Sequence, residues 1–232
     1  MPGPLTPGPM TPADSGRRTA IVIAIDGPAA SGKGTLARRL AEHFGYAYFE
    51  SGLLYRATAL RLLRAGIDSA DSDAAAAAAG DVTVADFADP ELRHDETANA
   101  AGIVAAIPAV RAALIDVQRH FIANPPDRAV GVVMDGRDIG TVICPDADHK
   151  IFVDASLEVR AQRRLKELRE RGVEGIESRV LQDMSARDAR DRERRVAPLI
   201  PAGDAFLLDT TALDADAAFA AAVDHVGSQN TS

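Results

Sequence analysis

The sequence predicts an α/β protein built on a five-stranded parallel sheet with helices on both faces. Runs of consecutive apolar residues, such as Ile21 to Ile25 and Val130 to Met134, are typical of strands buried on both sides. Segments with apolar residues at helical spacing separate these runs, so strands and helices alternate along the chain. At 232 residues the chain is long enough to bury such a core as one domain.

The expected elements follow one another in this order. We predict strands at 21–25, 46–49, 130–134, 151–153 and 205–209. The first helix follows Lys33, and the others are expected from Ser51 to about Ala65 and at 95–106, 108–124, 157–171, 177–196 and 215–226. Ser51 stands where a helix N-cap is expected. The alanine-rich segment 72–79 is either a short helix or an exposed connection.

The stretch before the first helix has the pattern of a phosphate-binding loop. Gly27, four residues, Gly32 and Lys33 follow a strand and precede a helix. The glycines allow several backbone N–H groups to turn toward one anion, and the helix adds the positive end of its dipole. The hydroxyl residue comes one place later than usual, as Thr35 after Gly34. This GKGT form resembles nucleoside monophosphate kinases more than GTPases, and it predicts magnesium held largely through water and phosphate oxygens.

Composition bounds the class of protein. A single cysteine excludes a disulfide framework, and no cysteine and histidine cluster has zinc spacing. Residues 1–17 are a proline-rich extension expected to be disordered, and without a signal peptide or membrane-length run we expect a cytoplasmic protein. The net charge is −8, yet half of the 26 Lys and Arg residues lie between 150 and 200. With no tryptophan and 4% aromatic residues, this segment favours a small anionic ligand over nucleic acid.

The third predicted strand ends in charged residues that are candidates for a site. Asp135, Arg137 and Asp138 emerge at its carboxyl end, where open α/β sheets bind ligands. Asp135 occupies the position from which such proteins hold magnesium, here through water, although a strand-end turn acid is the simpler alternative. Arg56 and Arg111, each taken alone, are more simply explained as solvated surface arginines.

A dense run of arginines lies between Arg187 and Arg195, interleaved with acids. A solvated helix with internal ion pairs is the ordinary explanation of such a run. The density of guanidiniums nevertheless favours a lid that closes over phosphates and excludes water. Arg160 and Arg164 share a helix face and either stay solvated or sandwich a nucleotide base. Phosphoryl transfer needs positioning and positive charge rather than a general base, so such arginines could suffice.

Together these motifs resemble those of bacterial cytidylate kinases. The segments that carry the resemblance stand in the family's order and span nearly everything from Ile21 to Asp209: GPAASGKGT, ESGLLYR, ETANAAGIVAAIPAVR, MDGRDIGTVICPDADHKIFVDAS and RDARDRERRVAPL. The resemblance implies transfer of the γ-phosphate of ATP to CMP or dCMP with Mg²⁺, by a monomer of the P-loop type. It implies one kinase domain over 18–228 with a tail at 229–232, a monophosphate-binding insertion at about 50–125 and a helical lid at about 157–196.

The resemblance also implies roles for individual residues. Arg56, Arg137 and Arg194 would hold the CMP phosphate, Arg111 and Asp138 the cytosine, and Asp191 the ribose hydroxyls. Ser51 and Gly102 complete that acceptor site, and Lys33, Arg137, Arg190 and Arg194 are the expected catalytic cations. The expected ATP contacts are Gly27, Pro28, Ala29, Ala30, Ser31, Gly32, Lys33, Gly34 and Thr35, with Arg160 and Arg164; Thr35 and Asp135 are the expected magnesium residues.

Two departures from the family pattern concern base selection. Family members often carry serine at the position of Gly102, where its hydroxyl contacts the base, so this contact is absent here or made by backbone. The segment between Val82 and Asp95 is also short. A P-loop kinase acting on another acceptor, such as UMP or AMP, therefore stays open. A GTP-dependent switch would need an Asn-Lys-x-Asp motif, and no lysine follows an asparagine here.

Overall fold

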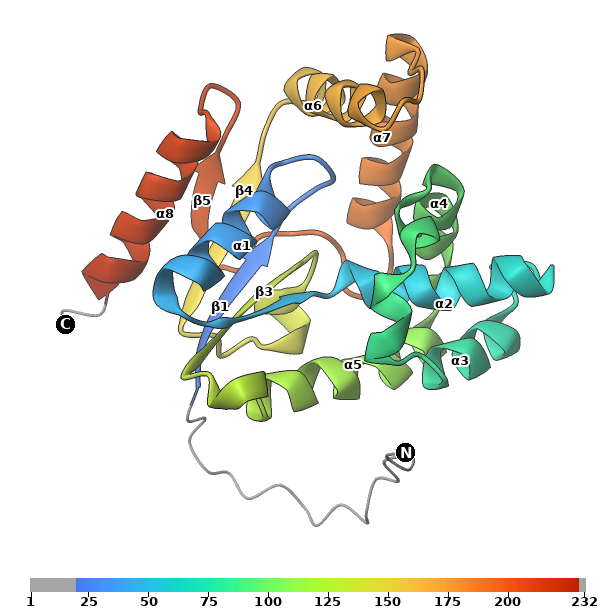
Figure 1. Ribbon diagram of the computed structural model, residues 1–232, viewed down its shortest axis with the longest axis horizontal. Coiled ribbons are helices and arrows are strands. Elements are labelled where there is room, and N and C mark those ends of the chain that lie inside the picture. Colours follow the sequence, from blue (N-terminus) through green and yellow to red (C-terminus); the bar gives the residue numbers. More distant parts are fainter. Residues whose placement is uncertain (1–19, 230–232) are drawn as a thin grey trace.

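Five parallel strands form the centre of the molecule, in the order β2-β3-β1-β4-β5. The computed structural model describes residues 20–229 (Figure 1). The strands are β1 (Ile21–Asp26), β2 (Ala47–Glu50), β3 (Gly131–Gly136), β4 (His149–Asp154) and β5 (Phe206–Asp209), and every neighbouring pair is parallel. The predicted α/β fold with a five-stranded parallel sheet is confirmed. The extension predicted at 1–17 and residues 230–232 lie outside the described residues.

Eight α-helices connect and cover the described strands. They are α1 (Lys33–Phe44), α2 (Gly52–Ala65), α3 (Ser72–Gly80), α4 (Asp95–Val104), α5 (Pro108–Ala123), α6 (Leu157–Glu170), α7 (Glu177–Glu193) and α8 (Ala215–Gln229). The alanine-rich segment is thus a helix, because Asp71 accepts hydrogen bonds from two N–H groups of its first turn. The short segment before α4 holds two 3₁₀ turns, Val84–Ala88 and Pro90–Arg93, and a π-helical turn spans Ile139–Ile143.

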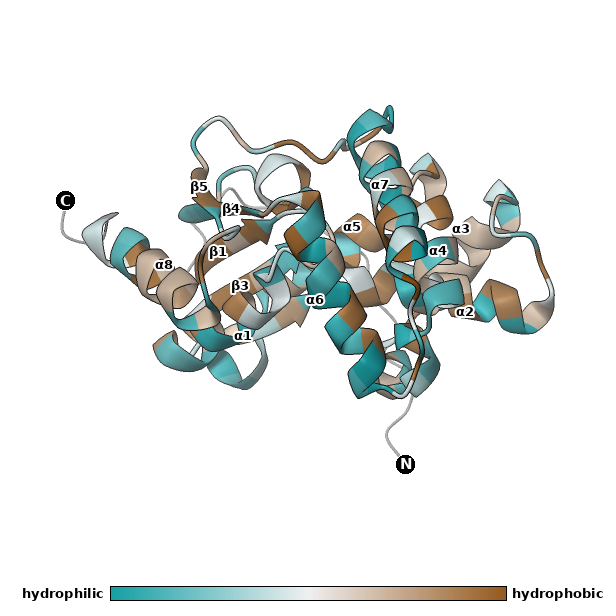
Figure 2. Cartoon of the chain, turned by 90° about the horizontal axis from the view of Figure 1, so that it is seen from above, coloured by the Kyte–Doolittle hydropathy of each residue, from teal (hydrophilic) through white to brown (hydrophobic). Residues whose placement is uncertain are grey.

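Alternation along β1 divides the core into two layers. Val22 and Ala24 pack with residues of α2 and α5, whereas Ile23 and Ile25 pack with residues of α1 and α8. Both sets are buried, as expected for a central strand of a parallel sheet. In Figure 2 these strands are brown (hydrophobic) and lie between helices that have teal (hydrophilic) residues on their outer sides. The carboxyl ends of β1, β3 and β4 therefore reach one edge of the sheet, on a rigid base.

Two groups of helices stand over that edge (Figure 1). In one group, α2 packs on α3 and α4, and α3 packs on α5. In the other, α6 and α7 pack on each other through Leu165, Leu168 and Met184. Among residues 20–229 no single helix is long and apolar enough to cross a membrane. The segments Asp95–Val104 and Pro108–Arg128 meet that length and composition only as a pair bent by 101°.

Of two local predictions, one is confirmed in position and one is wrong. Ser51 is the N-cap residue of α2 as predicted, but its hydroxyl donates to the Asp135 carbonyl at 2.8 Å and makes no capping bond. Helix α7 ends at Glu193, not near 196, because the chain turns back there. The Leu199 N–H binds the Asp191 carbonyl at 2.8 Å, and Ala197 takes a left-handed φ of 50°. Arg194 consequently lies in extended backbone that returns across the end of the helix.

Candidate active site

The loop between β1 and α1 is shaped to hold an anion. A Cβ on Gly27, whose φ is 153°, would lie 2.0 Å from the Val153 carbonyl oxygen, so only glycine fits there. Ala30 and Gly32 also adopt left-handed conformations, with φ of 58° and 94°. Helix α1 then begins at Lys33 with no side-chain cap and no acid in its first turn. Its first N–H groups are thus directed at the loop, as in anion sites at helix N-termini.

Two side chains hold this loop from the outside. Thr210 donates its hydroxyl to the Ser31 carbonyl at 3.0 Å. Arg163 of α6 donates from Nη1 to the same carbonyl at 3.2 Å and from Nη2 to the Thr210 carbonyl at 2.7 Å. These groups line a cavity of 400 Å³, together with Thr35, Lys166 and Leu213. One cavity therefore lies between the loop, the start of α1 and the surface of α6.

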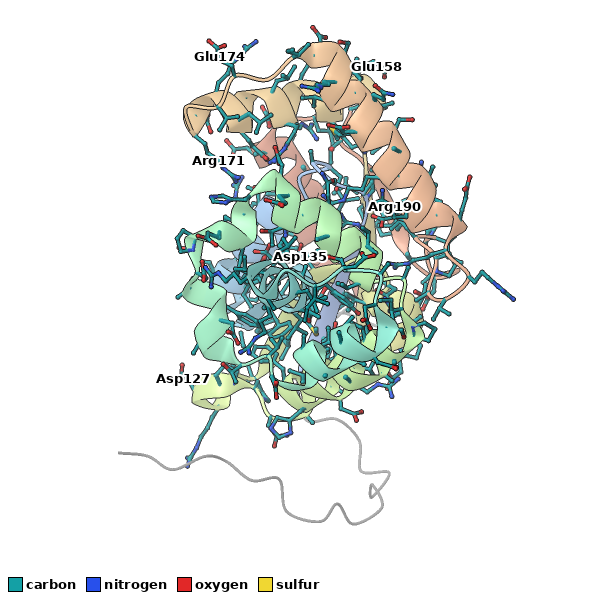
Figure 3. All side chains as sticks on the ribbon, turned by 90° about the vertical axis from the view of Figure 1, so that its right-hand side faces the viewer. Asp127, Asp135, Glu158, Arg171, Glu174 and Arg190 are labelled. Atoms are coloured by element: carbon teal, nitrogen blue, oxygen red, sulfur yellow. The ribbon has the colours of Figure 1, made fainter. Side chains whose placement is uncertain are left out.

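Lys33 and Asp135 face each other at the start of α1. The Lys33 ammonium lies 3.4 Å from the Pro28 carbonyl, and burial, with Arg137 next in effect, lowers its pKa to about 7. Burial raises the pKa of Asp135, while Lys33 acts in the opposite direction. The Tyr48 hydroxyl donates to Asp135 Oδ1 at 2.7 Å and fixes the carboxylate. Asp135 and Thr35 both line a cavity of 320 Å³ over the loop, and Figure 3 shows Asp135 deep between the two helix groups.

Several cations converge above the loop. A cavity of 200 Å³ is lined by Lys33, Arg56, Arg137, Arg164 and Arg187, with Asp95, Glu167 and Asp183 at its rim. Burial is the largest influence on both Arg56 and Arg187, and it lowers the pKa of each to about 10. Crowding buried guanidiniums is costly unless an anion joins them. The geometry therefore favours a polyanionic ligand.

All eight residues predicted for the acceptor site line one further cavity, of 120 Å³. They come from the start of α2, from α4 and α5, from the end of β3 and from α7 with the residue that follows it: Ser51, Arg56, Gly102, Arg111, Arg137, Asp138, Asp191 and Arg194. Lys33, Arg56, Arg137 and Arg187 line this cavity as well as the 200 Å³ one. The two spaces thus meet at four cations.

Ion pairs order the walls of the smaller cavity. Arg111, which is 2% exposed, pairs with Asp138, and Arg194 Nη2 lies 3.7 Å from the other Asp138 oxygen. Arg137 donates from Nε to Asp191 at 3.0 Å. Burial by itself would raise the pKa of Asp191, but Arg137 and Arg187 outweigh it and hold the pKa below its usual value. Both acids are therefore held as acceptors within the wall.

Three buried guanidinium nitrogens in this wall have no hydrogen-bond partner among the described residues. They are Arg111 Nε, Arg187 Nε and Arg194 Nη2. A buried donor without a partner costs about 1–3 kcal/mol, more when it is charged. Three such donors around one cavity indicate a ligand that brings acceptor oxygens or nitrogens.

Not every predicted residue is placed as expected. Arg160 is only 3% exposed, and it pairs with Asp188 of α7 while donating to the Ala29 carbonyl at 3.3 Å. Its guanidinium offers no face to a base, so the predicted sandwich with Arg164 is not formed; Arg164 pairs instead with Asp95 and Glu167. The expected catalytic Arg190 lies outside the two cavities.

Arg190 is exposed on α7 and extends toward α4 (Figure 3). A Cβ on Gly102 would lie 2.9 Å from Arg190 Nη1, so the missing side chain leaves room for this guanidinium. Gly102, which departs from the family pattern, thus lies where α7 approaches α4.

The positions of Arg187 and Arg163 at the site were not predicted from the sequence. Arg187 was one of a dense run, but its spacing of four to Asp191 places these two residues on one side of the helix. This helical spacing could have identified Arg187 as a candidate site residue. Arg163 had no comparable signal, because its partners at Ser31 and Thr210 are backbone and hydroxyl groups far along the chain.

Comparisons with known proteins agree with this arrangement. A family profile described as cytidylate kinase matches residues 23–228. A cytidylate kinase from Paramagnetospirillum magneticum is 58% identical over 208 residues, which cover 90% of this chain and 98% of the relative. A cytidylate kinase from Methylocella silvestris is also 58% identical, over 88% of this chain and 92% of the relative.

Among solved structures, an uncharacterized protein from Eubacterium ventriosum shares the fold. Its TM-score is 0.50 at 18% identity, covering 90% of this chain and 99% of that protein. At this identity the likeness concerns the fold alone. The sequence matches, which extend over nearly the whole described chain, carry the assignment: the chain belongs to the cytidylate kinase family.

Proposed function

We propose that this protein transfers the γ-phosphoryl group of ATP to CMP or dCMP, giving ADP and CDP or dCDP. The observation that carries the proposal is the pair of cavities that meet at Lys33, Arg56, Arg137 and Arg187. A donor on the glycine loop and an acceptor in the smaller cavity would place their reacting phosphates among these four cations. Phosphoryl transfer requires this positioning and charge, and little covalent help.

The ATP phosphates are proposed to bind the N–H groups of residues 27–35 and Lys33. The base then belongs in the 400 Å³ cavity beside the loop, between Arg163, Lys166 and Leu213. This replaces the predicted sandwich of Arg160 and Arg164. Arg160 instead supports the loop through the Ala29 carbonyl.

The residues at the loop also fit magnesium. Asp135 and Thr35 offer one carboxylate and one hydroxyl oxygen to the same cavity. Among the described residues no group of three or more His, Cys, Asp or Glu side chains could hold a metal by itself. Mg²⁺ suits such a sparse set, because it keeps several waters and binds phosphate oxygens. When bound, the ion would neutralise charge on the phosphates.

The acceptor site is proposed to read cytosine through Arg111 and Asp138. The guanidinium can donate to the ring carbonyl and ring nitrogen, and the carboxylate can accept from the amino group. Arg56, Arg137 and Arg194 would hold the phosphate and Asp191 the ribose. Arg187, whose buried Nε lacks a partner, joins them at the reacting phosphates. Segments 50–125 and 157–196 would act as acceptor-binding insertion and lid. A monomeric state, a cytoplasmic location and the absence of nucleic-acid and membrane partners stay predictions from the sequence.

An assay of ADP formation with the purified full chain tests the proposal. ATP and Mg²⁺ are supplied with CMP, dCMP, UMP, AMP or shikimate in parallel. We expect CMP and dCMP to be the preferred acceptors in kcat/KM. Equal or better turnover of UMP or AMP would overturn the cytosine assignment, and no ADP formation with any acceptor would overturn the reaction.

A further inference from the structure

Asp26 is a buried carboxylate at the carboxyl end of β1 for which the proposed reaction has no use. It is 6% exposed and immediately precedes Gly27, the first residue of the phosphate loop. Its Oδ1 accepts from the Ile139 N–H and its Oδ2 from the Gly140 N–H, both at 2.8 Å. These N–H groups belong to the start of the π-helical turn at Ile139–Ile143. Asp26 therefore caps a turn that is more than a hundred residues away in sequence.

The capped turn directly follows the acceptor residues. Arg137 and Asp138 form the two-residue link between the end of β3 and this turn. Their backbone is tied to the sheet on one side, where Gly136 pairs with Asp26 across the β1–β3 ladder. On the other side it is tied to the turn, which is held by the two hydrogen bonds to the Asp26 carboxylate and by Arg119, whose guanidinium donates to the carbonyls of Val142 and Ile143, both at 3.2 Å. Asp26 thus contacts both ends of the link, through its backbone at one end and its carboxylate at the other.

Capping alone does not require a charged group at this position. The pKa of Asp26 is raised to about 7, chiefly by burial, although the two N–H donors act to lower it. The nearest side chain of the opposite charge on β4, Lys150, is paired with Asp204 and touches the turn only through its methylenes, which lie 3.2 Å from a Cβ built on Gly140. A buried carboxylate without a cation partner is costly. Its two oxygens each accept one N–H group, whereas a neutral asparagine would offer a single oxygen for both.

We propose that Asp26 is a positioning residue, whose carboxylate sets the distance between the phosphate loop and the Arg137–Asp138 link. The inference rests on the proposed role of this link in holding CMP. Asp26 is bonded covalently to Gly27 and through hydrogen bonds to the turn. One residue therefore fixes the donor and acceptor sites relative to each other. Loss of either hydrogen bond would leave the phosphate loop intact and loosen the backbone of the link, whose side chains keep their ion pairs with Arg111 and Asp191.

The test replaces Asp26 with asparagine. Asn keeps the shape and one acceptor, but its amide places a donor against the second N–H. The dissociation constant for CMP, that for ATP and kcat are measured on wild type and D26N, with circular dichroism as a check of folding. We expect CMP binding to weaken by about tenfold, kcat to fall by about 10- to 100-fold, since small misplacements are costly, and ATP binding to change less than about twofold. Partial unfolding would instead lower the fraction of protein that binds CMP and the fraction that binds ATP by the same factor.

Two further variants keep the result decisive. Asp148→Asn is the matched control, because Asp148 also accepts a backbone N–H of β1, from Val22 at 2.8 Å, but at the opposite end of the strand. It should leave both dissociation constants unchanged. Asp26→Glu perturbs the proposed contact without a charge change, since it keeps both carboxylate oxygens but lengthens the side chain by one methylene. It should reproduce the weakened CMP binding, and it decides the matter if D26N does not fold.

Wild-type binding and kcat in folded D26N would overturn the inference, as would unchanged CMP binding in Asp26→Glu when D26N is unfolded. A wild-type protein that does not phosphorylate CMP would instead overturn the proposed function. The two failures are therefore distinguishable in one set of assays.

Discussion

Replacing Asp138 with alanine removes the acid at the centre of the acceptor wall and tests two consequences together. Arg111 and Asp138 are 2% and 5% exposed, so their ion pair is shielded from water. Removing one partner of a buried pair leaves an uncompensated charge and costs about 3–5 kcal/mol. We expect the free energy of unfolding to fall by this amount. A domain in the middle or upper part of the usual range of about 5–15 kcal/mol would still fold.

The second consequence is a loss of base selectivity. UMP has a carbonyl where CMP has its amino group, so it would leave the Asp138 carboxylate facing an acceptor. That mismatch is worth about 1–3 kcal/mol, or roughly 5- to 150-fold in kcat/KM. Asp138→Ala should narrow the preference for CMP over UMP by this factor. Arg137→Ala is the matched control, because a phosphate contact should depress both substrates alike.

Urea unfolding followed by circular dichroism measures the stability, since the chain has no tryptophan. The double variant Arg111→Met with Asp138→Ala should regain much of the lost stability, because no buried charge is left alone. Asp138→Asn provides a milder change if the alanine variant unfolds. A loss below about 1 kcal/mol would refute the buried-pair argument. An unchanged ratio of CMP to UMP would show that cytosine is read elsewhere.

Three other results are expected. Lys33→Ala should lower turnover about a hundredfold or more while the melting temperature is kept, and activity within about tenfold of wild type would contradict the role of the loop. The pKa of Lys33 is about 7 in the free protein, and a bound triphosphate would raise it. ATP binding above neutral pH should therefore take up protons, and the affinity for ATP should fall as the pH rises. Calorimetry in two buffers measures the proton uptake, and Lys33→Met should abolish it. Gly102→Ala should raise the free energy of unfolding by about 0.5–1 kcal/mol, as expected for glycine in a helix. Because Gly102 lines the proposed acceptor cavity, the added methyl group should also lower kcat/KM for CMP, and unchanged kinetics would argue against a role of this position in acceptor binding.

The sheet, its helices and the shape of the phosphate loop could be predicted from the sequence because each depends on neighbouring residues. The apolar run from Ile21 to Ile25 predicts a strand buried on both faces, whichever segments cover it. Gly27, Gly32 and Lys33 act through the backbone of one short loop. That the eight residues predicted for the acceptor site share one cavity could also be anticipated, because several motifs in a fixed order specify the family more strongly than local propensity does.

Tertiary structure alone decided which arginines are free to meet a ligand. Arg160, Arg163 and Arg164 lie within two turns of one helix, and their sequence context does not distinguish them. Packing of α6 on α7 buries Arg160 against Asp188, whereas Arg163 reaches the phosphate loop and Arg164 reaches Asp95. A rotation of about 100° per residue sends neighbouring side chains to different partners. Which partner each one meets depends on segments far away along the chain, and that information exists only once the chain has folded.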